Sequence, residues 1–176
     1  MNLPNQLTLL RVIMVPFFIA AYLMDHYLIA LIIFALASIT DFFDGKIARE
    51  RNLVTNFGKI MDPLADKILV YSALCLFLGS GHIKAWMLIV LLAREFIIAG
   101  MRTVAASEGT VLAAGMSGKI KTALQMVGII IMMLGLAIPQ HEDILIIGSL
   151  IFFVSIIAAV YSGTEYIIKN RSVFSM

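Results

Sequence analysis

Apolar residues are grouped along the chain into six long runs, which short polar segments separate. A helix needs about 20 mostly apolar residues to cross a bilayer, and each run is close to that length. The pattern therefore predicts an all-α integral membrane protein with six transmembrane helices. No repeat or linker divides the chain, so we expect residues 1–176 to form a single membrane domain. The predicted spans are 6–24, 28–47, 62–80, 84–105, 117–138 and 143–168.

The composition agrees with this pattern. Of the 176 residues, 61% are hydrophobic and 14% are charged, whereas a soluble domain has roughly 25% charged residues. The first apolar run is interpreted as a retained helix, because no basic cluster precedes it and Arg11 interrupts it. A single cysteine, Cys75, excludes an intrachain disulfide framework. We expect membrane lipid, and no nucleic acid, among the partners.

Basic residues are distributed unevenly over the connecting segments. The turns at 24–27, 79–84 and 139–143 contain one of them, Lys84. Cytoplasmic segments of membrane proteins are enriched in lysine and arginine. The many basic residues of the other connections and the termini therefore predict cytoplasmic termini in a multi-pass protein of the cell membrane. The opposite connections and the termini contain Lys46, Arg49, Arg51, Lys59, Arg102, Lys119, Lys121, Lys169 and Arg171.

Four aspartates lie beside or within the apolar runs. Asp41 and Asp44 are three residues apart and Asp62 and Asp66 are four apart, so each pair shares one face of a helix. Placing an acidic side chain near hydrocarbon costs free energy, so such a residue usually faces a polar cavity and belongs to a functional site. The topology puts both pairs at one depth near the cytoplasmic surface. Two such pairs predict a cavity holding a hard cation such as Mg²⁺, Mn²⁺ or Ca²⁺, as one or two ions.

The residues around the aspartates suggest phosphoryl transfer. Gly45 permits a close backbone approach at the end of the second span, and Thr55 offers a hydroxyl in the loop. Metal ions held by carboxylates can bridge a diphosphate and stabilise a leaving oxygen. An alternative is that the acids only form ion pairs with nearby cations. These cations are Lys46, Arg49, Lys59 and Lys67.

The N-terminal segment has a polar edge of its own. Asn5, Thr8 and Arg11 recur every three residues and share one helical face. One interpretation is an interfacial amphipathic turn that enters the membrane. The other is an edge that donates hydrogen bonds to a phosphorylated ligand. Its position at the level of the aspartates favours the ligand.

The central residues form the pattern Asp41-x2-Asp44-Gly45-x2-Ala48-Arg49-x8-Gly58-x3-Asp62-x3-Asp66, which resembles the signature of the CDP-alcohol phosphatidyltransferase family. The resemblance implies transfer of a phosphatidyl group from CDP-diacylglycerol to an alcohol, with release of CMP, by a homodimer that uses Mg²⁺ or Mn²⁺. It implies that Asp41, Asp44 and Asp62 bind the metal, and that Asp66 both binds it and takes the proton of the alcohol. The residues implied to contact CDP-diacylglycerol are Asn5, Thr8, Gly45, Arg49, Thr55 and Gly58.

Basic residues of the fourth and fifth spans are candidates for binding the alcohol. Arg94 and Arg102 lie on one face of the fourth span, and Lys119 and Lys121 open the fifth. Together they predict an anion site that binds the phosphate of an acceptor. The alternative for Arg94 is an ion pair with an acid of another helix, because its neighbour Glu95 is expected on a different face. The alternative for the other three is ordinary positive-inside topology.

A phosphate site favours glycerol 3-phosphate as the acceptor, and inositol phosphate or serine stays open with the same chemistry. The stretches N-L-P-N-Q-L-T-L-L-R, M-D-P-L-A-D-K and L-A-R-E-F-I-I-A-G-M-R resemble family members that use glycerol 3-phosphate. A divalent-cation transporter is a remote alternative, although Gly45, Arg49 and Gly58 have no evident purpose in it. A structural scaffold is the third possibility, and it predicts that Asp66→Asn leaves function intact.

Overall fold

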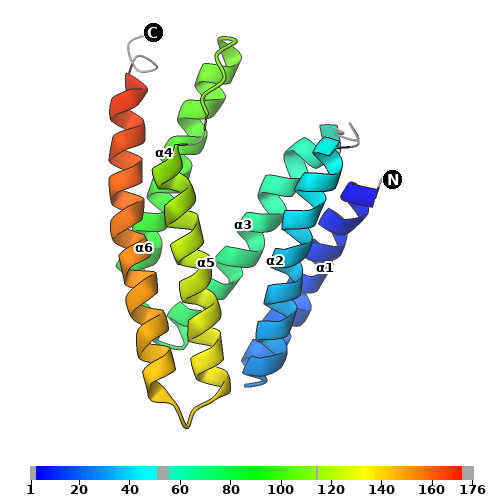
Figure 1. The fold of residues 1–176 in the computed structure, drawn as a ribbon, viewed down its shortest axis with the longest axis vertical. Helices are drawn as coiled ribbons and strands as arrows, with labels where there is room; N and C mark the ends of the chain where they lie inside the picture. Colours follow the sequence, from blue (N-terminus) through cyan, green and yellow to red (C-terminus); the bar gives the residue numbers. More distant parts are fainter. Residues whose placement is uncertain (1–2, 51–55, 114, 172–176) are drawn as a thin grey trace.

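The computed structural model describes residues 3–50, 56–113 and 115–171, with side chains for 8–40, 61, 64–113 and 115–171. The described residues form six α-helices and no strand (Figure 1), so the prediction of an all-α fold is confirmed. The helices are α1 (Leu3–Leu23), α2 (Tyr27–Glu50), α3 (Asn56–Gly79), α4 (Ala85–Ser107), α5 (Met116–Ala137) and α6 (Glu142–Lys169).

The two helices that carry the aspartates extend beyond the predicted spans, α2 slightly at its end and α3 by more than a turn at its start. α2 continues to Glu50, and α3 begins at Asn56. The expectation that the third helix begins near residue 62 is wrong, because Asp62 and Pro63 lie inside α3. The last residues of α2 include good helix formers such as Lys, Ala, Arg and Glu. The length of the apolar run therefore underestimates the length of both helices.

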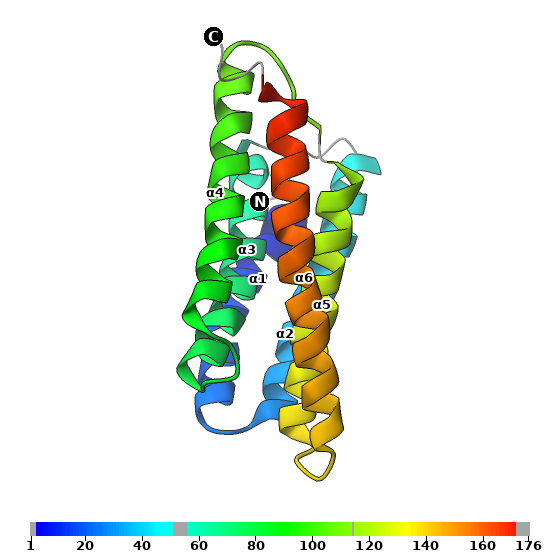
Figure 2. The ribbon, with the colours of Figure 1, turned by 90° about the vertical axis from the view of Figure 1, so that its left-hand side faces the viewer.

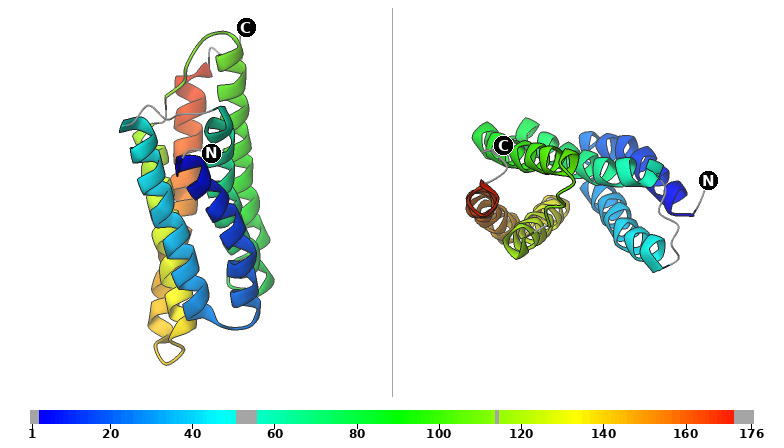
Figure 3. Two further views of the ribbon diagram at one scale, coloured as in Figure 1. Left: turned by 90° about the vertical axis from the view of Figure 1, so that its right-hand side faces the viewer. Right: turned by 90° about the horizontal axis from the view of Figure 1, so that it is seen from above.

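The six helices are arranged in two layers. Seen from above, α1, α3 and α4 form one row, and α2, α5 and α6 lie on the same side of it (Figure 3). The contacts agree, because α1 packs on α2 and α3, α2 on α5, α4 on α6 and α5 on α6. The turns α1–α2, α3–α4 and α5–α6 lie at one end of the molecule. The end of α2, the start of α3, the end of α4 and the start of α5 lie toward the other end, where the helices spread apart (Figure 1).

The interior between the layers is apolar. Phe18 of α1 and Phe34 of α2 are fully buried, with ring centroids 5.7 Å apart. α5 and α6 lie side by side over much of their length (Figure 2). They approach closely because Gly148 of α6 has no side chain: a Cβ there would lie 2.6 Å from the backbone nitrogen of Met132. Small residues are the usual means of close helix packing in membranes.

The outer surface is apolar as well. Phe17, Ile89 and Leu150 are each exposed by 60% or more. Exposed apolar surface of this extent indicates contact with lipid or another apolar partner. Within the described residues, α5 and α6 are long and apolar enough to cross a membrane, by length and composition. Shorter apolar stretches run through Thr8–Leu23 and Tyr27–Thr40.

Candidate active site

The four aspartates lie on two neighbouring helices. Asp41 and Asp44 belong to α2 and Asp62 and Asp66 to α3, and these helices contact each other. The side chain of Asp66 is half-buried. Among the side chains that the structure describes, no three His, Cys, Asp or Glu groups gather around a metal position. The other three aspartates lie outside that set, as do Asn5, Gly45, Arg49, Thr55 and Gly58.

The donor set is nonetheless suited to a hard divalent cation. It consists of carboxylates, two on each of two helices that touch, at spacings of one helical turn. Hard oxygen ligands of this kind are those that Mg²⁺ and Mn²⁺ prefer. The residues that would hold the ion are Asp41, Asp44, Asp62 and Asp66.

The polar edge of α1 lies against α2. Thr8 is fully buried and Arg11 is 1% exposed, and Nε of Arg11 donates to the carbonyl oxygen of Ala37 at 3.1 Å. The same carbonyl accepts a bond from the Thr40 hydroxyl at 2.8 Å. Ala37 is one turn before Asp41. Arg11 therefore supports the part of α2 that leads into the aspartates, and its burial argues against an interfacial turn at this point.

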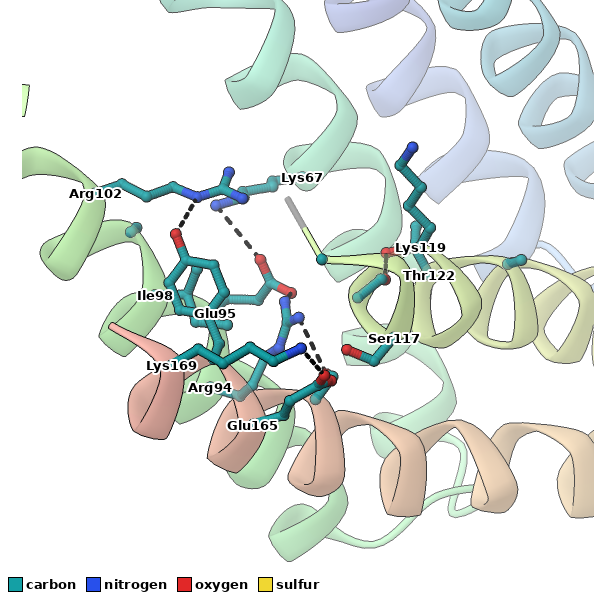
Figure 4. A pocket seen from close by; sticks show the side chains of 16 residues that line it. Lys67, Arg94, Glu95, Ile98, Arg102, Ser117, Lys119, Thr122, Glu165 and Lys169 are labelled. Atoms are coloured by element: carbon teal, nitrogen blue, oxygen red, sulfur yellow. Dashed lines mark hydrogen bonds and ion pairs between the residues drawn. The ribbon is translucent and has the colours of Figure 1, made fainter. Parts of the chain in front are cut away.

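A cavity of about 820 Å³ lies among α3, α4, α5 and α6 (Figure 4). Three of the four predicted acceptor residues, Arg94, Arg102 and Lys119, line it. The fourth, Lys121, is 3% exposed and bonds to Glu95, which lines the cavity. The charged residues that line the cavity are Lys67, Arg94, Glu95, Arg102, Lys119, Glu165 and Lys169.

Glu95 accepts contacts from cations of three helices. Its Oε1 lies 2.7 Å from Nη1 of Arg94 and 2.9 Å from Nζ of Lys121. Its Oε2 lies 3.7 Å from Nζ of Lys67. The alternative that Arg94 pairs with an acid of another helix does not hold among the described residues, because the acid that it contacts is its own neighbour. Adjacent residues on a helix point about 100° apart, and the long guanidinium side chain of Arg94 spans that separation.

Arg94 is held in a narrow space between α5 and α6. A Cβ at Gly163 would lie 3.0 Å from Cγ of Arg94, and a Cβ at Gly118 would lie 3.1 Å from its Nη2. Nη2 donates to the Ser162 hydroxyl at 3.1 Å. Its Nε is buried without a hydrogen-bond partner among the described residues. The guanidinium is thus fixed by packing and still has a donor to satisfy, which is typical of a site that binds an anion or water.

Arg102 is also oriented by α6. Its Nε donates to the hydroxyl of Tyr166 at 3.1 Å, and its guanidinium carbon lies 5.5 Å from the centre of the same ring. Among the side chains that the structure describes, six cations, counting Lys121, stand against two carboxylates in and behind the cavity wall. One of those carboxylates, Glu165, pairs with Lys169 one turn along α6. The cavity is therefore strongly positive and suited to an anion with more than one charge.

Glu95, Ser162 and Tyr166 contribute to the site but are not predicted as site residues from the sequence. Glu95 was expected to face away from Arg94, although an acid in an apolar run among basic residues is itself a signal. No local signal identifies Ser162 or Tyr166, because their partners are more than 60 residues away in sequence.

Comparison with known proteins decides the family. The family model described as CDP-alcohol phosphatidyltransferase matches residues 1–161. The chain belongs to the CDP-alcohol phosphatidyltransferase family. Members of this family are membrane-bound and generally depend on a divalent metal.

Several curated relatives of the family extend over nearly the whole chain. A Bacillus subtilis protein named CDP-diacylglycerol–glycerol-3-phosphate 3-phosphatidyltransferase is 40% identical, covering 96% of this chain and 95% of its own. A Rickettsia felis protein of the same name is 36% identical, covering 94% and 93%. A Mycobacterium tuberculosis (H37Rv) protein named probable phosphatidylglycerophosphate synthase is 37% identical, covering 96% and 81%.

The family match includes the aspartates and the cationic face of α4, and it ends at residue 161. Ser162 and Tyr166, which bind Arg94 and Arg102, lie just beyond that limit. The end of α6 therefore contributes to the wall of the same cavity.

Proposed function

We propose that this protein transfers the phosphatidyl group of CDP-diacylglycerol to glycerol 3-phosphate, which yields phosphatidylglycerol phosphate and CMP. The family and the names of its relatives support the chemistry and the acceptor. The observation that carries the proposal is the position of the basic cavity. Arg94, Arg102 and Lys119 line it together with Lys67, the residue that follows Asp66 on α3.

The donor is proposed to bind at the aspartate end of α2 and α3. Asn5, Thr8, Gly45, Arg49, Thr55 and Gly58 would contact its CDP part. Asp41, Asp44, Asp62 and Asp66 would hold one or two Mg²⁺ or Mn²⁺ ions. When bound, such ions neutralise the diphosphate and stabilise the oxygen that leaves with CMP.

The acceptor is proposed to bind with its phosphate in the basic cavity. Arg94, Arg102 and Lys119 would donate charge-assisted hydrogen bonds to the phosphate oxygens, and Lys121 would add positive charge from behind the wall. A phosphate fixed there would leave the primary hydroxyl of the same small molecule free to reach α3, from which Lys67 lines the cavity. Asp66 would take the hydroxyl proton as the oxygen attacks the phosphorus nearest the lipid. The bond from that phosphorus to the CMP oxygen breaks as the new bond forms.

The placement in the membrane is part of the proposal. Six helices would cross the cell membrane as one domain, 1–176, with both termini, the metal-containing cavity and the reaction on the cytoplasmic side. The basic connections at the wider end and the apolar outer surface support this orientation. A homodimer, as implied by the family resemblance, is the proposed assembly.

The test compares acceptors with purified protein in micelles that contain CDP-diacylglycerol and Mg²⁺. Labelled glycerol 3-phosphate, inositol phosphate and serine are supplied in competition, and lipid product and CMP are measured. Glycerol 3-phosphate should be the acceptor used, and a preference for either of the others overturns the assignment. Asp66→Asn should abolish CMP release while the protein stays folded. Metal flux into vesicles without CDP-diacylglycerol would instead support a transporter.

A further inference from the structure

The carboxylate of Glu95 is a meeting point of α3, α4 and α5. Lys67 reaches it from α3, Arg94 from its own helix and Lys121 from α5, at 3.7, 2.7 and 2.9 Å. Figure 4 shows the side chains of Lys67, Arg94 and Glu95 gathered at one part of the cavity wall, while Lys119 lies on the α5 side. The Glu95 side chain is 19% exposed, so its contacts with Arg94 and Lys121 are largely shielded from solvent, whereas Lys67 is 41% exposed.

Each of the three cations is connected to the proposed reaction. Lys67 directly follows Asp66, the proposed base. Arg94 lines the cavity in a space that Gly163 and Gly118 leave open. The side chain of Lys121 is 4% exposed, so its ammonium group depends on Glu95 for a partner. One carboxylate therefore joins the helix of the base to two residues of the acceptor site.

α4 packs mainly against α6 and makes fewer contacts with α3. The ion pair between Glu95 and Lys67 is thus an important link between the acceptor cavity and the helix of Asp66. A misplacement of about 1 Å between reacting groups can reduce the rate about a hundredfold. The ion pair between Glu95 and Lys67 therefore affects the distance and orientation of the acceptor hydroxyl relative to Asp66.

We propose that Glu95 is a positioning residue for the acceptor. Its carboxylate holds Arg94 and Lys121 in a fixed position relative to α3, the helix that carries Asp66. This inference rests on the proposed function and deepens it. The negative charge of a carboxylate in an anion site opposes anion binding. Glu95 therefore contributes to the reaction by the way it positions the neighbouring cations. The inference therefore predicts opposite effects on affinity and turnover when that charge is removed.

The decisive variant is Glu95→Gln, which keeps the shape of the side chain and removes its charge. At saturating glycerol 3-phosphate we expect kcat to fall about tenfold to a hundredfold. Competitive inhibition by inorganic phosphate should stay as strong or become stronger, because the cavity gains net positive charge. Glu95→Asp should recover part of the lost kcat. A purely structural role would lower the yield of folded enzyme and leave kcat per folded molecule unchanged.

Glu142→Gln is the matched control. It removes the same charge from an exposed position in the first turn of α6, outside the residues that line the cavity, and leaves Arg94, Lys121 and Lys67 in place. Its kcat should stay within about twofold of the wild-type value. Equal losses in the two variants, or a wild-type kcat in Glu95→Gln, would overturn the positioning role.

Lys67→Met keeps the inference testable if Glu95→Gln does not fold. The Lys67 side chain is 41% exposed, and its replacement leaves the buried contact of Glu95 with Lys121 intact. A several-fold loss of kcat is expected, together with weaker inhibition by inorganic phosphate because the cavity loses a positive charge, and an unchanged kcat overturns the link to α3. Wild-type enzyme that releases no CMP with glycerol 3-phosphate would defeat the proposed function instead, and the variants would then be assayed with the acceptor that is used.

Discussion

Arg102 and Tyr166 are joined in two ways across α4 and α6. Nε of Arg102 donates to the Tyr166 hydroxyl at 3.1 Å, and the guanidinium lies 5.5 Å from the centre of the ring. Tyr166 is buried, at 8% exposure, so it offers Arg102 a fixed surface at the edge of the cavity. An arginine held by a hydrogen bond and a ring loses little conformational freedom when it binds a phosphate.

Tyr166→Phe separates the two interactions, because it removes the hydroxyl and keeps the ring. We expect the KM for glycerol 3-phosphate to rise about fivefold, since a net hydrogen bond contributes about 1 kcal/mol. Tyr166→Leu should raise the KM further, because the cation–π contact adds about 0.5–2 kcal/mol. Steady-state kinetics in micelles measure both. Tyr161→Phe, an exposed tyrosine of the same helix, is the control and should match the wild-type enzyme.

Alanine substitution should have different effects at two glycines of α6, Gly163 and Gly148. At Gly163 a Cβ would meet Cγ of Arg94 at 3.0 Å, so Gly163→Ala should displace Arg94 and raise the KM for the acceptor, with a smaller loss of stability than at Gly148. At Gly148 a Cβ would meet the backbone of Met132 at 2.6 Å. That clash cannot relax by a side-chain movement, and Gly148→Ala should destabilise the fold by about 1–3 kcal/mol.

Gly100 provides the control for these substitutions. A Cβ at this exposed position of α4 would meet nothing within 4 Å. Alanine is favoured over glycine inside a helix by about 0.5–1 kcal/mol, so Gly100→Ala should be neutral or stabilising. Thermal unfolding in detergent, followed by circular dichroism, compares the stabilities. A melting temperature of Gly148→Ala equal to that of Gly100→Ala would contradict the packing of α5 on α6.

The sequence predicts the parts of this molecule that depend on local pattern. Apolar length and helical spacing place the six helices and put Asp41 with Asp44, and Asp62 with Asp66, on shared helices. The distribution of lysine and arginine also marks Arg94, Arg102 and Lys119, which line one cavity. These features depend on residues that are near each other in the chain.

The contacts that orient the cationic side chains could not be predicted in the same way. The pairing of Arg94 with Glu95 depends on how a long side chain bends, and helical spacing argues against it. The pairing of Lys121 with Glu95 depends on the packing of α5 beside α4. The spacing of residues shows which face of a helix they share, but it does not show which helix covers that face.

Removal of the divalent metal should stop the reaction and weaken the fold. Four carboxylates on α2 and α3 repel each other without a cation, so chelation by EDTA should abolish CMP release and lower the melting temperature. At a metal concentration 100 times the dissociation constant, binding stabilises the folded state by about 2.7 kcal/mol. Mg²⁺ or Mn²⁺ should restore both properties. Full activity after exhaustive chelation would contradict the assignment of the four aspartates.

Substitution of Arg11 should weaken metal binding by the aspartates, because Arg11 supports the part of α2 that leads to Asp41. Arg11 is buried and donates to the carbonyl oxygen of Ala37, one turn before Asp41. Arg11→Met keeps the apolar stem and removes that bond, which costs about 1.5–3 kcal/mol for a charged donor. We expect a lower melting temperature and a higher Mg²⁺ concentration at half-maximal CMP release, because the end of α2 is less firmly held. Thr40→Val, which removes the other side-chain bond to Ala37, should shift both in the same direction by a smaller amount. An Arg11→Met variant with reduced stability and an unchanged Mg²⁺ requirement would limit Arg11 to packing of α1 on α2.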